Sequence, residues 1–132
     1  MIASRKKPIN SRAKGAEAER ELAKVLTASG FPAERGQQKR GGADSPDVIC
    51  PALKGFHIEA KITQACKMHS PSMLASWDAQ ARRDSEGKSV PLVIHRWSRQ
   101  TTWWVRVLLP GFPPVWLTLP DFLSNVGLWR QP

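Results

Sequence analysis

Apolar side chains recur at helical spacing in residues 14–30. They share one stripe of the predicted helix: Ala18, Leu22, Val25 and Leu26. Gly30 follows as the left-handed residue that ends many helices. Glu19 lies three residues before Leu22, so an acidic side chain is predicted to share the inward-facing stripe.

Alternation of apolar and polar residues follows in residues 56–62, which predicts a strand with one apolar and one polar face. Glu59 and Lys61 project together from the polar face. A shorter apolar run begins at Asp47 and is separated from this strand by a turn. If the two runs pair as a hairpin, Asp47 converges with Glu59 and Lys61 at one end of it.

The remaining patterns complete an α/β fold. The predicted elements are helices at about 70–87 and 120–127 and strands at 89–97, 101–109 and 115–119. We therefore expect a central mixed β-sheet flanked by helices. Residues 14–132 form a single domain of ordinary size, in which residues 110–132 are a C-terminal extension.

Net charge points to a polyanionic partner. The 132 residues hold 20 Lys and Arg against 11 Asp and Glu, a formal net charge of +9, which favours nucleic acid. A membrane is disfavoured, because no apolar run approaches the ~20 residues of a spanning helix and the basic start lacks the apolar core of a signal peptide. These features indicate a cytoplasmic protein.

Basic residues gather in the first 40 positions, with ten Lys and Arg against four acids. Residues 1–13 are unpatterned and predict a flexible arm, and residues 36–46 predict a polar, basic loop. Both segments are expected to contact DNA phosphates, together with the start of the first helix. The DNA-binding residues predicted there are Arg5, Lys6, Lys7, Arg12, Lys14, Gln37, Gln38, Lys39 and Arg40.

Each candidate catalytic residue has an ordinary explanation when taken alone. The polar face of an amphipathic strand is commonly solvated, a Ser-Pro-Asp sequence is common in turns, and Glu19 by itself is a helix acid. What favours chemistry is the joint placement of Glu19, Asp47, Glu59 and Lys61 in a basic protein.

Metal-assisted phosphodiester hydrolysis explains why these residue types occur together. Carboxylates and a main-chain carbonyl are hard oxygen ligands for Mg²⁺, for which Mn²⁺ is expected to substitute. Asp47 and Glu59 are the predicted primary ligands. The carbonyl of Ala60 is a third, and Glu19 completes the site directly or through water. Lys61 orients or activates the attacking water and stabilises developing charge.

Several other residues keep two interpretations. His57 shares the polar face with Glu59 and is either a partner of the site or an exposed strand histidine. Gln80, on the second helix, either hydrogen-bonds a phosphate or bound water or lies on a solvated face. His95 and Arg96 end a strand, where they either contact DNA or simply form surface.

One side of the second helix is apolar and carries Met73, Leu74 and Trp77. It is either a subunit interface or packs on the protein's own sheet. An interface would make the protein a homodimer.

The sequence "PDV" at 46–48, followed twelve residues after Asp47 by "EAK" at 59–61, resembles the PD-(D/E)xK nuclease motif. The segment "KGAEAERELAKVLTASGF" with Arg35 resembles the opening helix of the archaeal-type Holliday junction resolvases. "HIEAK", "QARRDSEGKSVPLVIHR" and "WWVRV" resemble the phage and bacterial branch of that family. The resemblance runs from about residue 14 to residue 109. The archaeal loop carries a Gly-Ser pair where this chain has Gly36-Gln37-Gln38.

The resemblance implies a restriction-endonuclease-like fold and assigns the family's catalytic positions to Glu19, Asp47, Glu59 and Lys61. It implies DNA contacts by Arg20 and Arg35. The implied activity is Mg²⁺-dependent, structure-selective cleavage of four-way junctions by a homodimer, in recombination or phage DNA processing in the bacterial cytosol. Two alternatives remain open: a nicking, flap or restriction-like nuclease with the same site chemistry, and a non-catalytic DNA-binding module with the same fold.

Overall fold

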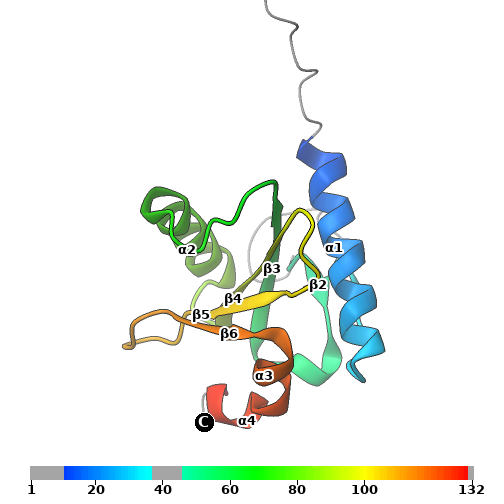
Figure 1. The fold of residues 1–132 in the computed structure, drawn as a ribbon. Coiled ribbons are helices and arrows are strands. Elements are labelled where there is room, and N and C mark those ends of the chain that lie inside the picture. Colours follow the sequence, from blue (N-terminus) through cyan, green and yellow to red (C-terminus); the bar gives the residue numbers. More distant parts are fainter. Residues whose placement is uncertain (1–10, 37–45, 131–132) are drawn as a thin grey trace, which may run out of the picture.

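The computed structural model describes residues 11–36 and 46–130, and the side chains from residue 15 onward. Helices and strands are mixed along the chain (Figure 1). In order, the elements are α1 (Ser11–Ala28), β1 (Glu34–Arg35), β2 (Val48–Ile49), the 3-10 helix η1 (Pro51–Leu53), β3 (Phe56–Thr63), α2 (Pro71–Ser85), β4 (Val90–Trp97), β5 (Trp104–Val107), β6 (Val115–Thr118), α3 (Leu119–Ser124) and α4 (Val126–Trp129). The fold is mixed α/β, as the sequence predicts.

A four-stranded sheet in the order β3-β4-β5-β6 forms the centre. β3 and β4 are parallel, with Glu59 opposite Val93 and Lys61 opposite His95, and the other two pairs are antiparallel. Parallel neighbours need a crossover connection, which α2 provides. The sheet is therefore mixed, and β3 forms one of its edges.

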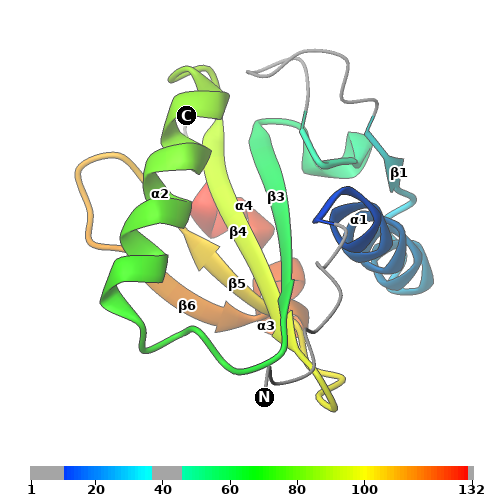
Figure 2. The same ribbon diagram turned by 90° about the horizontal axis from the view of Figure 1, so that it is seen from above.

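The two faces of this sheet are covered by different helices, so the molecule has three layers (Figure 2). α1 and α3 pack on one face, where the main core contains Leu22, Leu26, Ile58, Ile94 and Phe122. Fully burying an apolar side chain of this size contributes about 1.5–3 kcal/mol relative to leaving it exposed. The helical stripe predicted for α1 is confirmed, and Gly30 follows the helix with a φ of 91°.

α2 covers the opposite face of the sheet. Trp77, only 6% exposed, packs with Ala81, Val93 and Leu108, and Met73 and Leu74 lie half-buried against this cluster. Of the two interpretations of the apolar side of α2, packing on the protein's own sheet is the one the structure shows for Trp77. The placement of Trp77 in a subunit interface is therefore wrong, because its ring is already buried within the protomer.

The predicted hairpin of the runs at Asp47 and Glu59 is also wrong. β2 is only two residues long and pairs antiparallel with β1, in a separate two-stranded sheet. Pro51 begins η1 directly afterwards and has no amide hydrogen, so a longer ladder cannot form. A main-chain hydrogen bond from Asp47 N to Ile58 O at 3.0 Å ties this segment to β3.

Several predictions lie outside the described residues. These are the arm at residues 1–10 and the loop residues Gln37, Gln38, Lys39 and Arg40, together with the side chains of Arg12 and Lys14. None of the helices in the described part of the chain is both long and apolar enough to cross a bilayer.

Candidate active site

Asp47 lies at the free edge of β3, where two main-chain contacts hold it. Its amide donates to Ile58 O, and its carboxylate Oδ2 accepts a hydrogen bond from Ala60 N at 2.8 Å. A strand residue directs its N–H and C=O to the same edge. The carbonyl of Ala60 therefore faces the edge at which Asp47 lies, as its predicted role as a ligand requires.

Glu59 lies on the polar face of β3, and this face is buried rather than solvated. The exposed fractions are 3% for Glu59 and 2% for His57, because α2 covers this face of the sheet. His57 Nε2 lies 3.1 Å from Glu59 Oε1. Burial lowers the pKa of His57, which favours the neutral imidazole, and Nε2 donates to Glu59 in the tautomer that carries its proton there. Of the two interpretations of His57, the exposed strand histidine is wrong, because its side chain is buried and lies against Glu59.

The two carboxyl groups of Asp47 and Glu59 form a coupled pair. Burial, followed by the charge of Glu59, raises the pKa of Asp47 to about 7. Burial likewise raises the pKa of Glu59 to about 7, although a hydrogen bond from Asp47 and the charge of Lys61 oppose the rise. Both carboxyl groups are therefore protonated more readily than exposed acids, chiefly because they are buried.

Lys61 extends from the same face toward α2. Its Nζ donates to Gln80 Oε1 at 3.0 Å, and its side chain is half-buried. Gln80 thus holds the ammonium group close to the acid pair. Of the two interpretations of Gln80, contact with the site is the one that this hydrogen bond supports.

Glu19 lies on the inward side of α1, with 5% of its surface exposed. Its carboxylate accepts a hydrogen bond from Arg35 Nε across to β1. Burial raises the pKa of Glu19, while the bond from Arg35 opposes the rise and the nearby charge of Asp47 adds to it. Glu19 therefore belongs to the same electrostatic unit as Asp47, with Arg35 as its direct partner.

One acidic residue of the site was missed from sequence. Asp84, half-buried on α2, hydrogen-bonds the carboxyl group of Glu59 and raises its pKa further. Asp84 follows Gln80 by four residues, so the two share a helix face. This spacing could have identified Asp84 from the sequence, since Gln80 is one of the residues predicted to contact the site.

His95 was also misjudged as a possible surface residue. It is fully buried, Lys67 N donates to its Nε2 at 3.2 Å, and Nδ1 lies 3.0 Å from Lys61 O. Because Nε2 accepts, Nδ1 must carry the proton and donate to Lys61 O. Burial lowers the pKa of His95, and the rings of Trp77 and Trp97 lie against it. His95 thus fixes the main chain at Lys61.

Of the arginines predicted to contact DNA whose side chains the structure describes, two are exposed and one is largely buried. Arg20 is exposed on α1, and Arg35 keeps 46% of its side chain exposed while it binds Glu19. Arg96 has 16% of its side chain exposed and donates to Glu21. The role of Arg96 is therefore to join β4 to α1.

The residues at the site fit a hard divalent cation. Within residues 11–36 and 46–130, no three His, Cys, Asp or Glu side chains form a ready-made metal cluster. Glu19 stays a predicted ligand that completes the site directly or through water. Mg²⁺ commonly binds through one or two carboxylates and keeps several waters. Asp47, Glu59 and the Ala60 carbonyl suit that pattern, and burial raises the pKa of both carboxyl groups to about 7.

Comparison with known proteins agrees with this geometry. The family described as "Phage putative PDDEXK endonuclease" matches residues 10–113, which is well over half of the chain and includes α1 through β5. No curated protein matches the chain. The match is to phage nucleases of the PD-(D/E)xK superfamily and not to the archaeal-type junction resolvases in particular. The chain belongs to this family of phage PD-(D/E)xK endonucleases.

Proposed function

We propose that this endonuclease hydrolyses DNA phosphodiester bonds with Mg²⁺ and acts on branched DNA, with the four-way junction as its substrate. The observation that carries the chemical part is the buried pair of Asp47 and Glu59 beside Lys61. The preference for branched DNA rests on the resemblance of α1 and Arg35 to the resolvases. Mn²⁺ is expected to replace Mg²⁺ at the same ligands.

Each residue of the site has a separate role in the proposed hydrolysis. Asp47, Glu59 and the Ala60 carbonyl hold the ion, which when bound supplies a water of lowered pKa and neutralises phosphate charge. His57 keeps the Glu59 carboxylate oriented through the 3.1 Å contact. Lys61, held by Gln80 at 3.0 Å, orients the attacking water and stabilises charge on the phosphate.

Glu19 and Arg35 form the other wall of the site. Their ion pair keeps the carboxylate of Glu19 in place near Asp47, where Glu19 would complete the site directly or through water when an ion is bound. The exposed part of Arg35 remains free to approach a phosphate of the substrate. Arg20, exposed on the neighbouring surface of α1, provides a second positive charge there.

Homodimerisation is part of the same proposal. Cutting two opposed strands of a junction in one encounter needs two sites related by two-fold symmetry. Unlike Trp77, Met73 and Leu74 on α2 are only half-buried. These two residues are therefore the ones that we propose for the subunit interface. Sedimentation of the wild type and of Leu74→Glu, with circular dichroism as a folding control, tests this. A variant that remains dimeric places the interface elsewhere.

The central experiment compares cleavage of a four-way junction, a flap and a linear duplex with and without Mg²⁺. Asp47→Asn and Glu59→Gln should each lower the cleavage rate by at least about 1,000-fold while DNA binding persists, because the ligands are lost and the basic surface is not. Glu17→Gln is the matched control, since Glu17 is exposed on α1 and should leave the rate unchanged.

The outcomes separate the alternatives. Equal cleavage of junction and duplex would indicate a nicking or restriction-like nuclease, and preferred cleavage of the flap would indicate a flap nuclease. Absence of metal-dependent cleavage on every substrate would leave a DNA-binding module. Retained turnover in Asp47→Asn or Glu59→Gln would refute the assigned site.

A further inference from the structure

The turn between β4 and β5 carries an arginine in a backbone conformation that favours glycine. Gln100 N donates to Trp97 O at 3.1 Å, and Arg99, the third residue of this turn, has a φ of 68°. A type II turn places its third residue in this region, where Gly or Asn is usual because a Cβ is strained there. Such an outlier raises the question of what the arginine side chain does.

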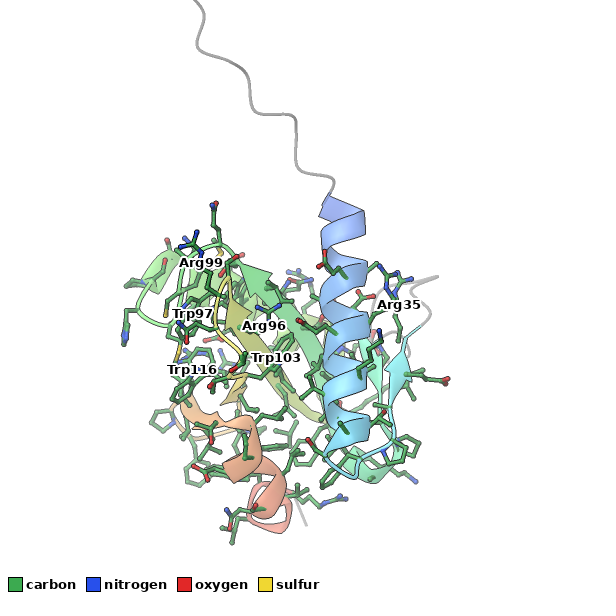
Figure 3. All side chains as sticks on the ribbon, turned by 45° about the vertical axis from the view of Figure 1, so that its right-hand side comes forward. Arg35, Arg96, Trp97, Arg99, Trp103 and Trp116 are labelled. Carbon is green, nitrogen blue, oxygen red and sulfur yellow. The ribbon has the colours of Figure 1, made fainter. Side chains whose placement is uncertain are left out.

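Arg96 holds this turn rigidly against α1. Its Nε and Nη2 donate to Glu21 Oε2 at 3.0 and 2.6 Å. Its Nη1 donates to the carbonyls of Trp97 and Gln100 at 3.2 and 3.1 Å, and its guanidinium lies over the ring of Trp103. Arg96 therefore acts as an internal brace, and Figure 3 shows it between the turn and α1.

Arg99 itself makes no comparable contact. It is exposed, and its guanidinium has neither a hydrogen bond nor an ion pair with any residue that the structure describes. Arg35 and Arg106, by contrast, each bind a carboxylate of the protein. A rigid turn thus presents a full set of guanidinium donors to solvent, at the backbone cost of a left-handed residue (Figure 3).

The turn lies close to the candidate active site along the sheet. Ser98 N donates to Thr63 O at 3.0 Å, which joins the turn to the end of β3. Thr63 follows Lys61 by two residues, or ~7 Å along a strand. A DNA strand that is bound at Lys61 and continues along β3 therefore runs toward the turn.

We propose that Arg99 is a DNA-binding residue that contacts a backbone phosphate of double-stranded DNA on one side of the cleaved bond. This inference rests on the proposed function for the position of the scissile phosphate. A guanidinium can bind two phosphate oxygens at once, and a rigid turn fixes the register of that contact. Arg99 thereby adds a positive charge beyond the end of β3.

The test compares glycine substitutions at Arg99 and at Glu86, which both have a left-handed backbone conformation. Arg99→Gly removes the charge and relieves the left-handed strain, so it should fold and should raise the melting temperature. Glu86→Gly is the matched control, because Glu86 is exposed at the end of α2 with a φ of 54° and should be stabilised in the same way. Arg99→Lys keeps the charge. Binding to a labelled four-way junction and a linear duplex is measured in EDTA, across a salt series.

We expect Arg99→Gly to weaken binding by roughly 5–20-fold at about 0.1 M salt and to lower the slope of log K against log salt by about 1. Arg99→Lys should bind within roughly threefold of wild type. Glu86→Gly should bind as wild type does, or slightly more tightly because an acid is removed. Unchanged affinity and slope in Arg99→Gly would overturn the proposal, as would an equal loss in Glu86→Gly.

The binding assay and the cleavage assay fail independently. Wild-type protein that binds DNA in EDTA but cleaves no substrate with Mg²⁺ would refute the proposed function and leave the role of Arg99 in binding to be decided by the variants. Wild-type cleavage together with normal binding by Arg99→Gly would refute the role of Arg99 alone.

Discussion

At the scale of single residues, Asp47 and Glu59 link protonation to metal binding, because the same carboxyl groups take part in both. Each has a pKa raised to about 7, chiefly by burial. A carboxyl whose pKa rises on folding stabilises the fold fully below its unfolded pKa, near 4, and loses that contribution as the pH rises through 7. The same deprotonation prepares the ligands for a cation, so metal-free stability and metal affinity should change in opposite directions with pH.

We predict that the metal-free protein loses roughly 2–4 kcal/mol of its free energy of unfolding between pH 5 and pH 8 through these two groups. Asp47→Asn should be stabilised relative to wild type at pH 8 and much less so at pH 5. Mg²⁺ should raise the melting temperature of wild type at pH 8, and not that of Asp47→Asn. Thermal melts in EDTA and in Mg²⁺ at the two pH values measure this. Identical pH profiles for wild type and variant would contradict the raised pKa values.

His95 is a second residue whose role is testable in detail. Asn at this position places its amide nitrogen where Nδ1 lies and can still donate to Lys61 O, whereas Gln places its amide oxygen near Nε2 and can still accept from Lys67 N. We expect His95→Asn to keep most of kcat and His95→Gln to lose roughly tenfold, with KM for DNA unchanged in both.

Amide hydrogen exchange provides the structural readout for His95. Exchange at Lys67 N should accelerate in His95→Asn and stay slow in His95→Gln, because only the latter keeps an acceptor there. Equal kcat in both variants, together with this exchange pattern, would show that the bond to Lys61 O has no bearing on catalysis.

At the scale of elements, α2 connects the sheet to the site. Its inner side packs Trp77 and Ala81 on the sheet, and its adjacent side presents Gln80 and Asp84 to β3. Asp78 adds a two-point ion pair with Arg106 on β5, with both N–O distances at 2.9 Å. The packing of α2 on the sheet therefore positions Gln80 beside Lys61 and Asp84 beside Glu59.

We predict that Trp77→Ala lowers the free energy of unfolding by about 3–5 kcal/mol, since a large buried side chain is removed. Trp77→Glu should prevent folding altogether, because a charge would be buried without a partner. Chemical denaturation followed by circular dichroism measures both, and Leu74→Ala, at a half-buried position, should cost much less. A Trp77→Glu protein that folds as a stable monomer would contradict the buried position.

At the scale of the whole molecule, charge is distributed unevenly. Residues 1–40 carry ten Lys and Arg against four acids, whereas residues 41–90 carry six of each. The segment with the candidate site is thus close to neutral, beside a strongly basic one. Such an arrangement favours binding of DNA by the basic segment and of a cation by the acidic pair.

We predict that removal of residues 1–10, which leaves α1 intact, lowers the slope of log K against log salt by about 2–3, because Arg5, Lys6 and Lys7 are lost. Full-length protein with these three residues changed to Gln is the control for chain length and should behave alike. Fluorescence anisotropy with labelled DNA over a salt series measures the slopes. An unchanged slope in both proteins would show that this segment does not contact phosphates.

The sequence by itself determined the features that depend on local periodicity and on residue type. The stripe of α1 with Glu19 on its inward side, the shared face of Glu59 and Lys61, and the α/β class follow from spacings of 3.6 and 2 residues. The candidate catalytic residues followed from motif spacing, because metal-assisted chemistry needs these side chains whatever the surrounding fold.

Only the tertiary structure decided which faces are buried and which residues meet across the chain. Periodicity shows that β3 has a polar face, but α2 arrives from elsewhere in the sequence and makes that face part of the interior. The contacts of Asp84 with Glu59 and of His95 with Lys61 join residues 25 and 34 positions apart. Long-range pairings of this kind depend on how layers pack, and packing is set by the sum of many contacts and by no local pattern.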